Sequence, residues 1–137
     1  MTRILVDTNI FLDILCERED FVDASEAALN WCVDHPNAAW MAWHSLSNLH
    51  FIGLKYVSKS KTEAFISDML KIFEISPTDT RTARFARMLP IPDFEDALQV
   101  AAADMVKADF ILTRNLKDYK KSPIPAMAPE EFLERFV

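Results

Sequence analysis

Short apolar runs alternate with longer segments of helical periodicity along the whole chain. The first run, Ile4–Val6, is unbroken and apolar, as is usual for a strand buried inside a parallel sheet. Four further runs predict strands at residues 38–43, 73–75, 109–113 and 126–128. Because strands and helices alternate throughout, we expect residues 1–137 to form a single domain, a three-layer α/β/α sandwich around a central parallel sheet of about five strands.

Helical segments with recognisable starts separate these runs. Asn9 can cap a helix that begins at Ile10, and Ser60 to Glu63 match a capping box at the start of a later helix. Pro129 suits the first position of the last helix. One apolar stripe at helical spacing consists of Phe94, Ala97, Leu98, Ala101, Ala102 and Met105. The helices are expected to begin near residues 10, 20, 45, 60, 79, 94 and 129.

The composition is that of a globular domain. Half of the 137 residues are hydrophobic, which argues against disorder, and no apolar run is long enough to span a membrane. The N-terminus enters the first strand directly and lacks the apolar segment of a signal peptide, so we expect a cytoplasmic protein. Cys16 and Cys32 form no CxxC pair and are expected to be reduced, mostly buried thiols.

Charge and glycine content exclude several function classes. The formal net charge is −6, whereas proteins that bind nucleic acid over a wide surface are usually basic. This charge favours a concentrated acidic site with small basic patches around it. Gly53 is the only glycine, which excludes a P-loop and a GxGxxG nucleotide loop, because both need several glycines.

Acidic residues stand at the ends of several predicted elements. Asp7 follows the first strand, the trio Asp93, Glu95 and Asp96 opens a helix, and Asp118 follows the fourth strand. If the first and fourth strands are neighbours, these residues lie at one edge of the sheet, where open α/β sheets bind ligands. Carboxylates gathered there repel one another unless a cation joins them, and Mg²⁺ or Mn²⁺ takes such ligands. Each residue alone is better explained as a turn or capping residue, so the hypothesis rests on the set and requires that the fold bring its members together.

Three short motifs contain most of these residues. They are Val6-Asp7-Thr8-Asn9, then Asp96-Ala97-Leu98 at the start of an alanine-rich helix, then Leu112-Thr113-Arg114-Asn115 followed by Asp118 and Tyr119. In this order and spacing they resemble the PIN domain family, in particular small bacterial proteins similar to VapC toxins. The resemblance covers essentially the whole chain. It implies a Mg²⁺- or Mn²⁺-dependent ribonuclease, often paired with an antitoxin protein, and it favours a homodimer.

The resemblance also assigns roles to individual residues. Asp7, Asp96 and Asp118 would be the catalytic metal ligands, Asn9 and Thr113 would be polar support, and Asn115 would stand close to the metal. The sequence departs from the family at Asn48, because the helix after the second strand usually carries a glutamate there. Loss of one carboxylate should weaken cation binding, and Glu95 or Asp93 could compensate for it. Asn115 is a second departure, because many relatives have aspartate, and Asp118 could take that role.

Other interpretations use the same acidic residues differently. Haloacid-dehalogenase-like enzymes normally need DxD after the first strand, where this chain has Asp7-Thr8-Asn9, and phosphotransfer receivers need a lysine that is not found near Ala128. A further alternative is a binding protein rather than an enzyme, namely a catalytically silent PIN-like module that binds RNA or a protein. Asn48 is the residue that supports this alternative, and binding of RNA without metal-dependent cleavage would favour it.

The remaining candidates are basic and aromatic. Arg114 and Lys117 border the proposed site and are expected to contact RNA phosphates. His44 and His50 are more often polar surface residues than catalytic bases. A basic face that solvation explains equally well contains Arg81, Arg84 and Arg87.

Aromatic residues are concentrated between Trp40 and Tyr56. We expect them to lie mostly in the core. Their bulk exceeds what one strand and one helix need, which predicts a two-fold dimer with the helices of residues 45–71 in its interface.

Overall fold

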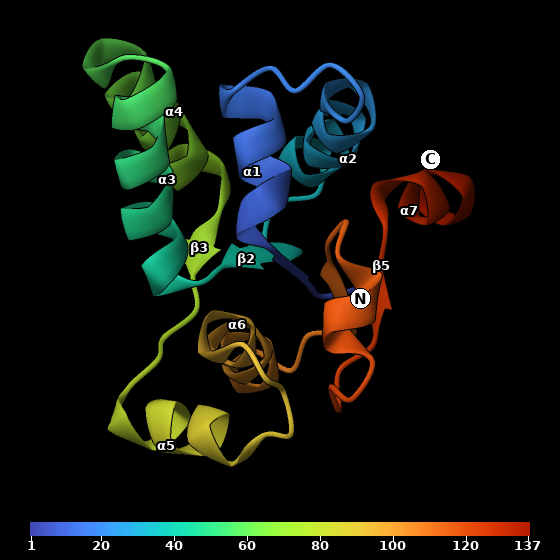
Figure 1. The fold of residues 1–137 in the computed structure, drawn as a ribbon. Helices are drawn as coiled ribbons and strands as arrows, with labels where there is room; N and C mark the ends of the chain where they lie inside the picture. The colour runs from blue at the N-terminus through green and yellow to red at the C-terminus, as the bar shows by residue number, and fades with distance from the viewer.

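A computed structural model describes all residues 1–137 and has a five-stranded parallel sheet at its centre (Figure 1). The strands are β1 (Ile4–Val6), β2 (Ala39–Met41), β3 (Glu74–Ile75), β4 (Phe110–Leu112) and β5 (Ala126–Met127). Their order in the sheet is β3-β2-β1-β4-β5. The central strand β1 is paired in parallel with β2 on one side and β4 on the other, so the carboxyl ends of these three strands share one edge.

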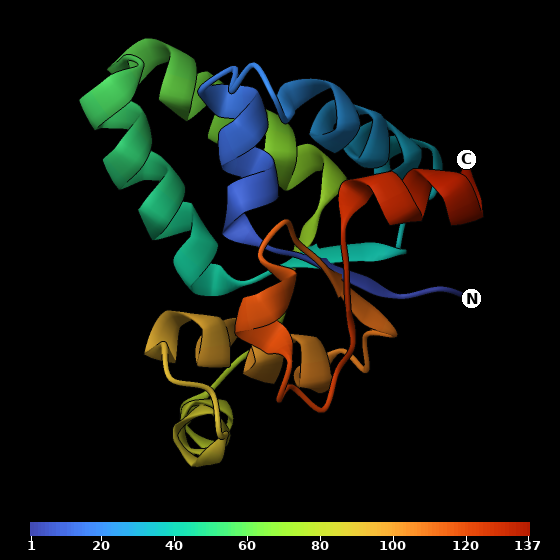
Figure 2. The same ribbon diagram turned by 45° about the vertical axis from the view of Figure 1, so that its right-hand side comes forward.

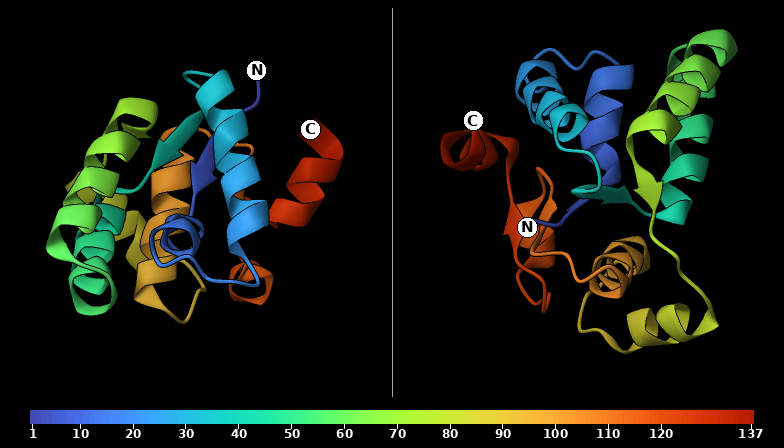
Figure 3. Two further views of the ribbon diagram at one scale, coloured as in Figure 1. Left: turned by 90° about the horizontal axis from the view of Figure 1, so that it is seen from above. Right: turned by 180° about the vertical axis from the view of Figure 1, so that it is seen from behind.

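Helices cover both faces of this sheet, which confirms the predicted three-layer architecture (Figure 2). The helices are α1 (Thr8–Leu15), α2 (Val22–Asp34), α3 (Trp43–Tyr56), α4 (Lys59–Ile72), α5 (Thr80–Met88), α6 (Phe94–Met105), the 3-10 helix η1 (Leu116–Tyr119) and α7 (Pro129–Phe136). Helices α5 and α6 pack together below the sheet, and α1 to α4 and α7 lie above it in the view of Figure 1. The right-hand view of Figure 3, from behind, shows the same separation.

Alternate side chains of β1 enter two separate hydrophobic cores. Ile4 and Val6 pack with Phe11 of α1 and with residues of α2, α3, α4 and α7. Leu5 points to the other face and packs with Val100 of α6. Since every side chain of β1 is buried on one face or the other, an unbroken apolar strand is needed at this position.

The start of α1 differs from the sequence prediction. This helix begins at Thr8 and not at Ile10, because the Asp7 side chain accepts a hydrogen bond from the backbone N–H of Thr8 and acts as the N-cap. Asn9 therefore lies inside the first turn and caps nothing. Its amide is left available to the residues around Asp7.

The observed starts of the later helices agree more closely with those predicted from the sequence. Ser58, rather than Ser60, caps α4 by accepting a hydrogen bond from a backbone N–H. Asp79 caps α5 with a capping box, and Asp93 caps α6 through the backbone N–H of Asp96, as predicted. Both carboxylates thus have a structural role independent of any ligand.

The expectation that the aromatic residues after β2 are mostly core is wrong. Trp43, Phe51 and Tyr56 are 68 %, 69 % and 68 % exposed, respectively. Helix α3 packs against α1 and α4, and its outer face has no neighbour. Only Leu49 on this helix is a large residue that is fully buried.

Two general expectations can be compared with the fold directly. The two cysteines are free, and burial raises the pKa of the Cys32 thiol to about 12. None of the helices combines the length and the apolar character needed to cross a membrane.

Candidate active site

Asp7 lies at the carboxyl end of the central strand and is almost completely buried. Its Oδ1 accepts a hydrogen bond from the N–H of Thr8 at 2.7 Å, and its Oδ2 accepts one from the Thr113 hydroxyl at 2.8 Å. The amide of Asn9 lies 3.4 Å from the same Oδ2 and 3.3 Å from the Thr113 hydroxyl. Burial raises the pKa of Asp7, and these hydrogen bonds oppose that rise because they favour the ionised form. Thus Asn9 and Thr113 lie where the resemblance implied, beside Asp7.

Asp96 comes from the other layer and faces the same region. It lies in the first turn of α6, and Asp93 caps this helix through the Asp96 N–H at 3.1 Å. Burial, followed by the charges of Asp93, Asp7 and Asp118, raises the pKa of Asp96 to about 7. Both causes act in the same direction, because burial and neighbouring negative charges each disfavour the ionised carboxylate.

Tyr119 joins these two acids and was missed as a site residue by sequence reasoning. Its hydroxyl lies 3.0 Å from Oδ2 of Asp7 and 3.4 Å from Oδ1 of Asp96. The side chain is buried in the core formed by α5 and α6, and burial together with the two acids raises the pKa of its hydroxyl. The phenol therefore stays protonated and donates to a carboxylate.

Asn48, where the resemblance led us to expect a glutamate, contacts Glu95. Its amide Nδ2 donates a hydrogen bond to Oε1 of Glu95 at 2.6 Å. Burial, followed by the charges of Asp93 and Asp7, raises the pKa of Glu95. A glutamate from α6 thus stands beside the amide of α3, at the edge of the acidic group, which is where the compensation hypothesis requires it.

Asp118 and Asn115 lie on the exposed loop that follows β4. The Asp118 carboxylate is exposed and acts electrostatically on Asp7 and Asp96. Asn115 is also exposed, and its backbone N–H donates to the Thr113 hydroxyl at 3.1 Å. Lys117 is exposed between them and forms no ion pair.

Arg114 has a role in holding this loop in place. Its guanidinium donates to both carboxylate oxygens of Asp13, at 2.7 and 2.8 Å, and lies 3.9 Å from the centre of the Phe21 ring. Asp13 has no exposed surface and also accepts from the Ser25 hydroxyl at 2.8 Å. The bidentate pair joins the loop to α1 and α2. These contacts occupy the guanidinium that the sequence analysis expected to meet RNA phosphates.

A buried polar network lies beside the site, and sequence reasoning did not predict it. The hydroxyls of Thr8 and Ser45 are 2.8 Å apart, and Nε2 of Gln99 lies 2.9 and 3.0 Å from them. This network connects the starts of α1 and α3 with the middle of α6. It fixes the relative positions of the helices that carry Asp7, Asn48 and Asp96.

The charge of this region is uncompensated. No lysine or arginine forms an ion pair with Asp7, Asp93, Glu95, Asp96 or Asp118. As the side chains stand, no three acidic, histidine or cysteine residues are close enough to hold one ion jointly, and the Tyr119 hydroxyl lies between Asp7 and Asp96. The donor chemistry nevertheless fits a hard divalent cation, because oxygen ligands of like charge gather there and no lysine or arginine is paired with them.

Five parallel strands in this order, with acidic side chains at their carboxyl edge, define an α/β protein with the PIN-like fold. The chain belongs to the PIN domain family, whose model matches residues 3–117. This assignment confirms the resemblance inferred from the three motifs. A comparison with curated protein sequences gave no match.

Solved structures with a similar fold include VapBC proteins. VapBC2 from Rickettsia felis bound to a promoter DNA fragment has a TM-score of 0.74 and 17 % identity, with 93 % of this chain and 98 % of that chain covered. DNA-bound VapBC from Salmonella typhimurium has a TM-score of 0.73 and 15 % identity, with 94 % and 99 % covered. A toxin-antitoxin complex from Klebsiella pneumoniae has a TM-score of 0.68 and 21 % identity, with 92 % and 97 % covered. At these identities, the likeness establishes the fold.

Proposed function

We propose that this protein is a metal-dependent endoribonuclease that hydrolyses RNA phosphodiester bonds at the acidic site of Asp7, Asp96 and Asp118. The observation that carries the proposal is the junction of Asp7 and Asp96 through Tyr119 at the carboxyl edge of the sheet. Acids from two layers meet there without any basic partner, and the pKa of Asp96 is raised to about 7. Such an arrangement is typical of a cation-dependent site rather than of two helix caps.

Mg²⁺ or Mn²⁺ is the proposed cofactor. Asp7 and Asp96 would hold the ion, with Glu95 and Asp118 at its rim. When bound, the ion supplies an activated water and stabilises charge on the phosphoryl group. The chain's own contribution is orientation, because Thr113 and Tyr119 hold the Asp7 carboxylate in one position. Lys117, which is exposed and adjacent to Asp118, is the proposed phosphate contact.

Asp7→Asn tests this proposal, because it removes a charge and changes little volume. We expect cleavage of a mixed RNA pool with Mn²⁺ to be lost, while circular dichroism shows an intact fold. Asp20→Asn, at an exposed aspartate before α2, is the matched control and should cleave like the parent. Unchanged Mn²⁺ affinity of Asp7→Asn in titration calorimetry would refute the assignment of the metal site.

The alternative is a silent module that binds RNA or protein, and Asn48 favours it. Because the Asn48 amide donates to Glu95, Asn48→Glu would place two carboxylates against each other. In a nuclease this variant should bind Mn²⁺ more tightly and cleave at least as fast as the parent. Absence of cleavage by both parent and Asn48→Glu, across many RNAs, would leave the binding module as the better reading.

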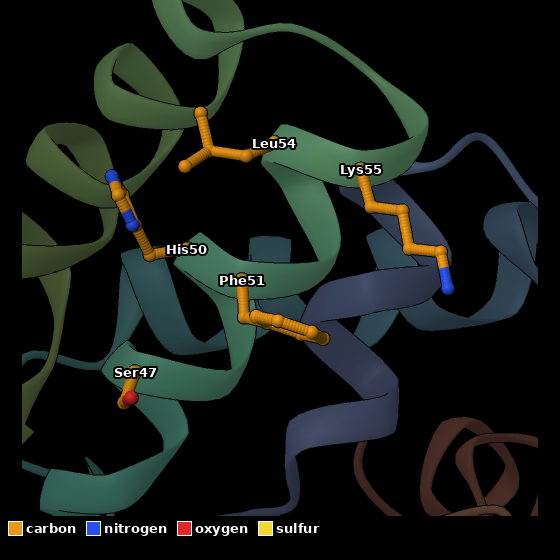
Figure 4. A pocket seen from close by; sticks show the side chains of 5 residues that line it. All are labelled: Ser47, His50, Phe51, Leu54 and Lys55. Carbon is orange, nitrogen blue, oxygen red and sulfur yellow. The ribbon is translucent and has the colours of Figure 1, made fainter.

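We also propose an antitoxin partner and a homodimer. The antitoxin proposal rests on the family and on the similar structures, which are described as toxin-antitoxin complexes or VapBC proteins. The dimer proposal rests on the free outer face of α3. A groove of about 550 Å³ there is lined by Ser47, His50, Phe51, Leu54 and Lys55, which project from successive turns of the helix (Figure 4).

A further inference from the structure

A small cavity lies between the starts of α3 and α5 and the side of α6. Its volume is about 170 Å³, and it is large enough for one planar ring system. Ala42, Leu98 and Ala102 form an apolar wall, whereas Asp79 and Thr82 contribute polar atoms from the start of α5. Ligand sites usually combine an apolar wall with a few fixed polar atoms, and this cavity has that lining but is smaller than a typical small-molecule pocket, so it suits a single ring system.

This cavity is adjacent to the acidic site. Glu95, Leu98 and Ala102 follow one another at helical spacing on the same side of α6, so the apolar wall begins one turn beyond Glu95. His44 also lines the cavity, and its ring lies close to the backbone of Glu95 at the edge of the acidic site. A group in the cavity would therefore stand about one helical turn from Glu95, at the rim of the proposed cleavage site.

Trp43 stands at the mouth of the cavity and is 68 % exposed. A second hollow of about 320 Å³, lined by residues 75–78, borders the same indole. A large aromatic ring between two hollows has a face available for stacking. Stacking on aromatic side chains is the sequence-tolerant way in which proteins hold the bases of single-stranded nucleic acid.

Asp79 supplies a hydrogen-bond acceptor at the rim. Its Oδ1 accepts from the backbone N–H and from the hydroxyl of Thr82, both at 3.1 Å. These bonds to Thr82 lower the pKa of Asp79, so the carboxylate is ionised at neutral pH and its second oxygen remains an acceptor. Adenine and cytosine present an exocyclic amino donor to such an oxygen, whereas the one donor on the pairing edge of uracil, its ring N3–H, lies between two carbonyl oxygens that repel a carboxylate.

We infer that this cavity binds one base of the RNA next to the cleaved bond, stacked on Trp43 and hydrogen-bonded through an amino group to Asp79. The inference rests on the proposed ribonuclease function and extends it to substrate choice. A chain with a net charge of −6 gains little from phosphate attraction, so contacts with bases must supply much of the RNA affinity.

The test measures binding of three single-stranded RNA hexamers, made of adenine, cytosine or uracil alone. Fluorescence anisotropy is recorded in the Asp7→Asn background, so that the RNA stays intact. We expect adenine and cytosine hexamers to bind more tightly than uracil. Trp43→Ala should weaken that binding about 5- to 150-fold, the range that stacking of one base provides, and Trp43→Phe should restore much of it.

Two further variants distinguish loss of base recognition from a non-specific loss of RNA binding. Asp79→Asn keeps the helix cap, since asparagine caps as well as aspartate, but should reduce the preference over uracil because an amide also donates. Tyr56→Ala removes an equally exposed aromatic from the far end of α3 and should bind RNA like its parent.

The outcomes distinguish this inference from the proposed function. If the parent cleaves RNA and Trp43→Ala changes neither affinity nor the cleaved positions, the base site is overturned and the nuclease stands. If no RNA is cleaved but base-selective binding is lost in Trp43→Ala, the base site is supported and the nuclease is overturned. Failure of every hexamer to bind overturns the base site.

Discussion

The hydroxyl of Tyr119 connects two acids from different elements, Asp7 at the end of β1 and Asp96 at the start of α6. That hydroxyl has one proton, yet it lies within 3.0 Å of Asp7 and 3.4 Å of Asp96. The hydroxyl can therefore donate its proton to only one of the two carboxylates. If it donates to Asp7, a protonated Asp96 can in turn donate to the hydroxyl oxygen. Burial, followed by the charges of Asp93, Asp7 and Asp118, raises the pKa of Asp96, whereas the hydrogen bond from Tyr119 lowers it.

Proton binding at Asp96 should make the metal-free protein less stable as pH rises. The pKa of this carboxyl is about 7 in the folded protein, against an ordinary value of 3.8. The folded state thus binds the proton more tightly, so its stabilising effect is complete below about pH 4 and is lost as pH rises through about 7. We expect the melting temperature in EDTA to fall over this interval, and Asp96→Asn to flatten the dependence.

Thermal unfolding monitored by circular dichroism provides this measurement. Asp20→Asn, at an exposed position, should keep the slope of the parent. An Asp96→Asn profile parallel to that of the parent would show that Asp96 does not titrate in this interval. Addition of Mn²⁺ should reduce the slope, because a cation replaces the proton.

At the residue scale, the sequence could predict those site residues that stand at element ends. Asp7, Asp93 and Asp96 follow a strand or open a helix, and a local pattern marks each place. No local pattern identifies Tyr119 or Gln99 as a site residue, because each makes its contact with a residue far away in the sequence. Tyr119 lies 112 positions from Asp7, and Gln99 lies 91 positions from Thr8. A tyrosine after a turn and a glutamine among alanines resemble ordinary core and surface residues.

At the scale of elements, the loop after β4 is held by a buried ion pair. Arg114 and Asp13 connect this loop to α1, and Asp13 has no exposed surface. The loop carries Asn115 and Asp118, so the ion pair positions one side of the site. Its place could not be read from the sequence, since Arg114 and Asp13 lie 101 residues apart.

Arg114→Ala should destabilise the protein by up to about 3–5 kcal/mol, because it leaves the buried Asp13 carboxylate with only the Ser25 hydroxyl and a 3.5 Å contact to Arg18. Urea unfolding measures this loss. The control is Arg135→Ala, which removes an exposed ion pair with Glu131 and should cost at most about 1 kcal/mol. Arg114→Met combined with Asp13→Leu should recover much of the stability, and equal losses for Arg114→Ala and Arg135→Ala would contradict this account.

The elements themselves were largely predictable, whereas their exposed faces were not. An unbroken apolar run marks β1 as central, and capping residues mark α5 and α6. The periodicity of α3 does not say which side of the helix other elements cover. Phe51 consequently lies in solvent although its type suggests core.

At the scale of the whole molecule, the outer face of α3 is the place where a second copy is proposed to bind. Phe51→Asp puts a charge in the middle of the groove on this face and should convert a dimer into a monomer. Sedimentation velocity at tens of micromolar measures the change. Val33→Asp, at an exposed apolar residue of α2, should leave the assembly as in the parent. A parent that sediments as a monomer would refute the proposed dimer.

The pairing of β1 with β4 determines when, during protein synthesis, the acidic site can form. Synthesis reaches Asp7 well before its partners, because Thr113 and Tyr119 follow it by 106 and 112 positions. Until β4 has been synthesised, the central strand lacks one neighbour, and the Asp7 carboxylate remains in water with ordinary acidity. The acids are therefore brought together only when synthesis has passed residue 119, so a growing chain carries no assembled site beside the RNA that encodes it.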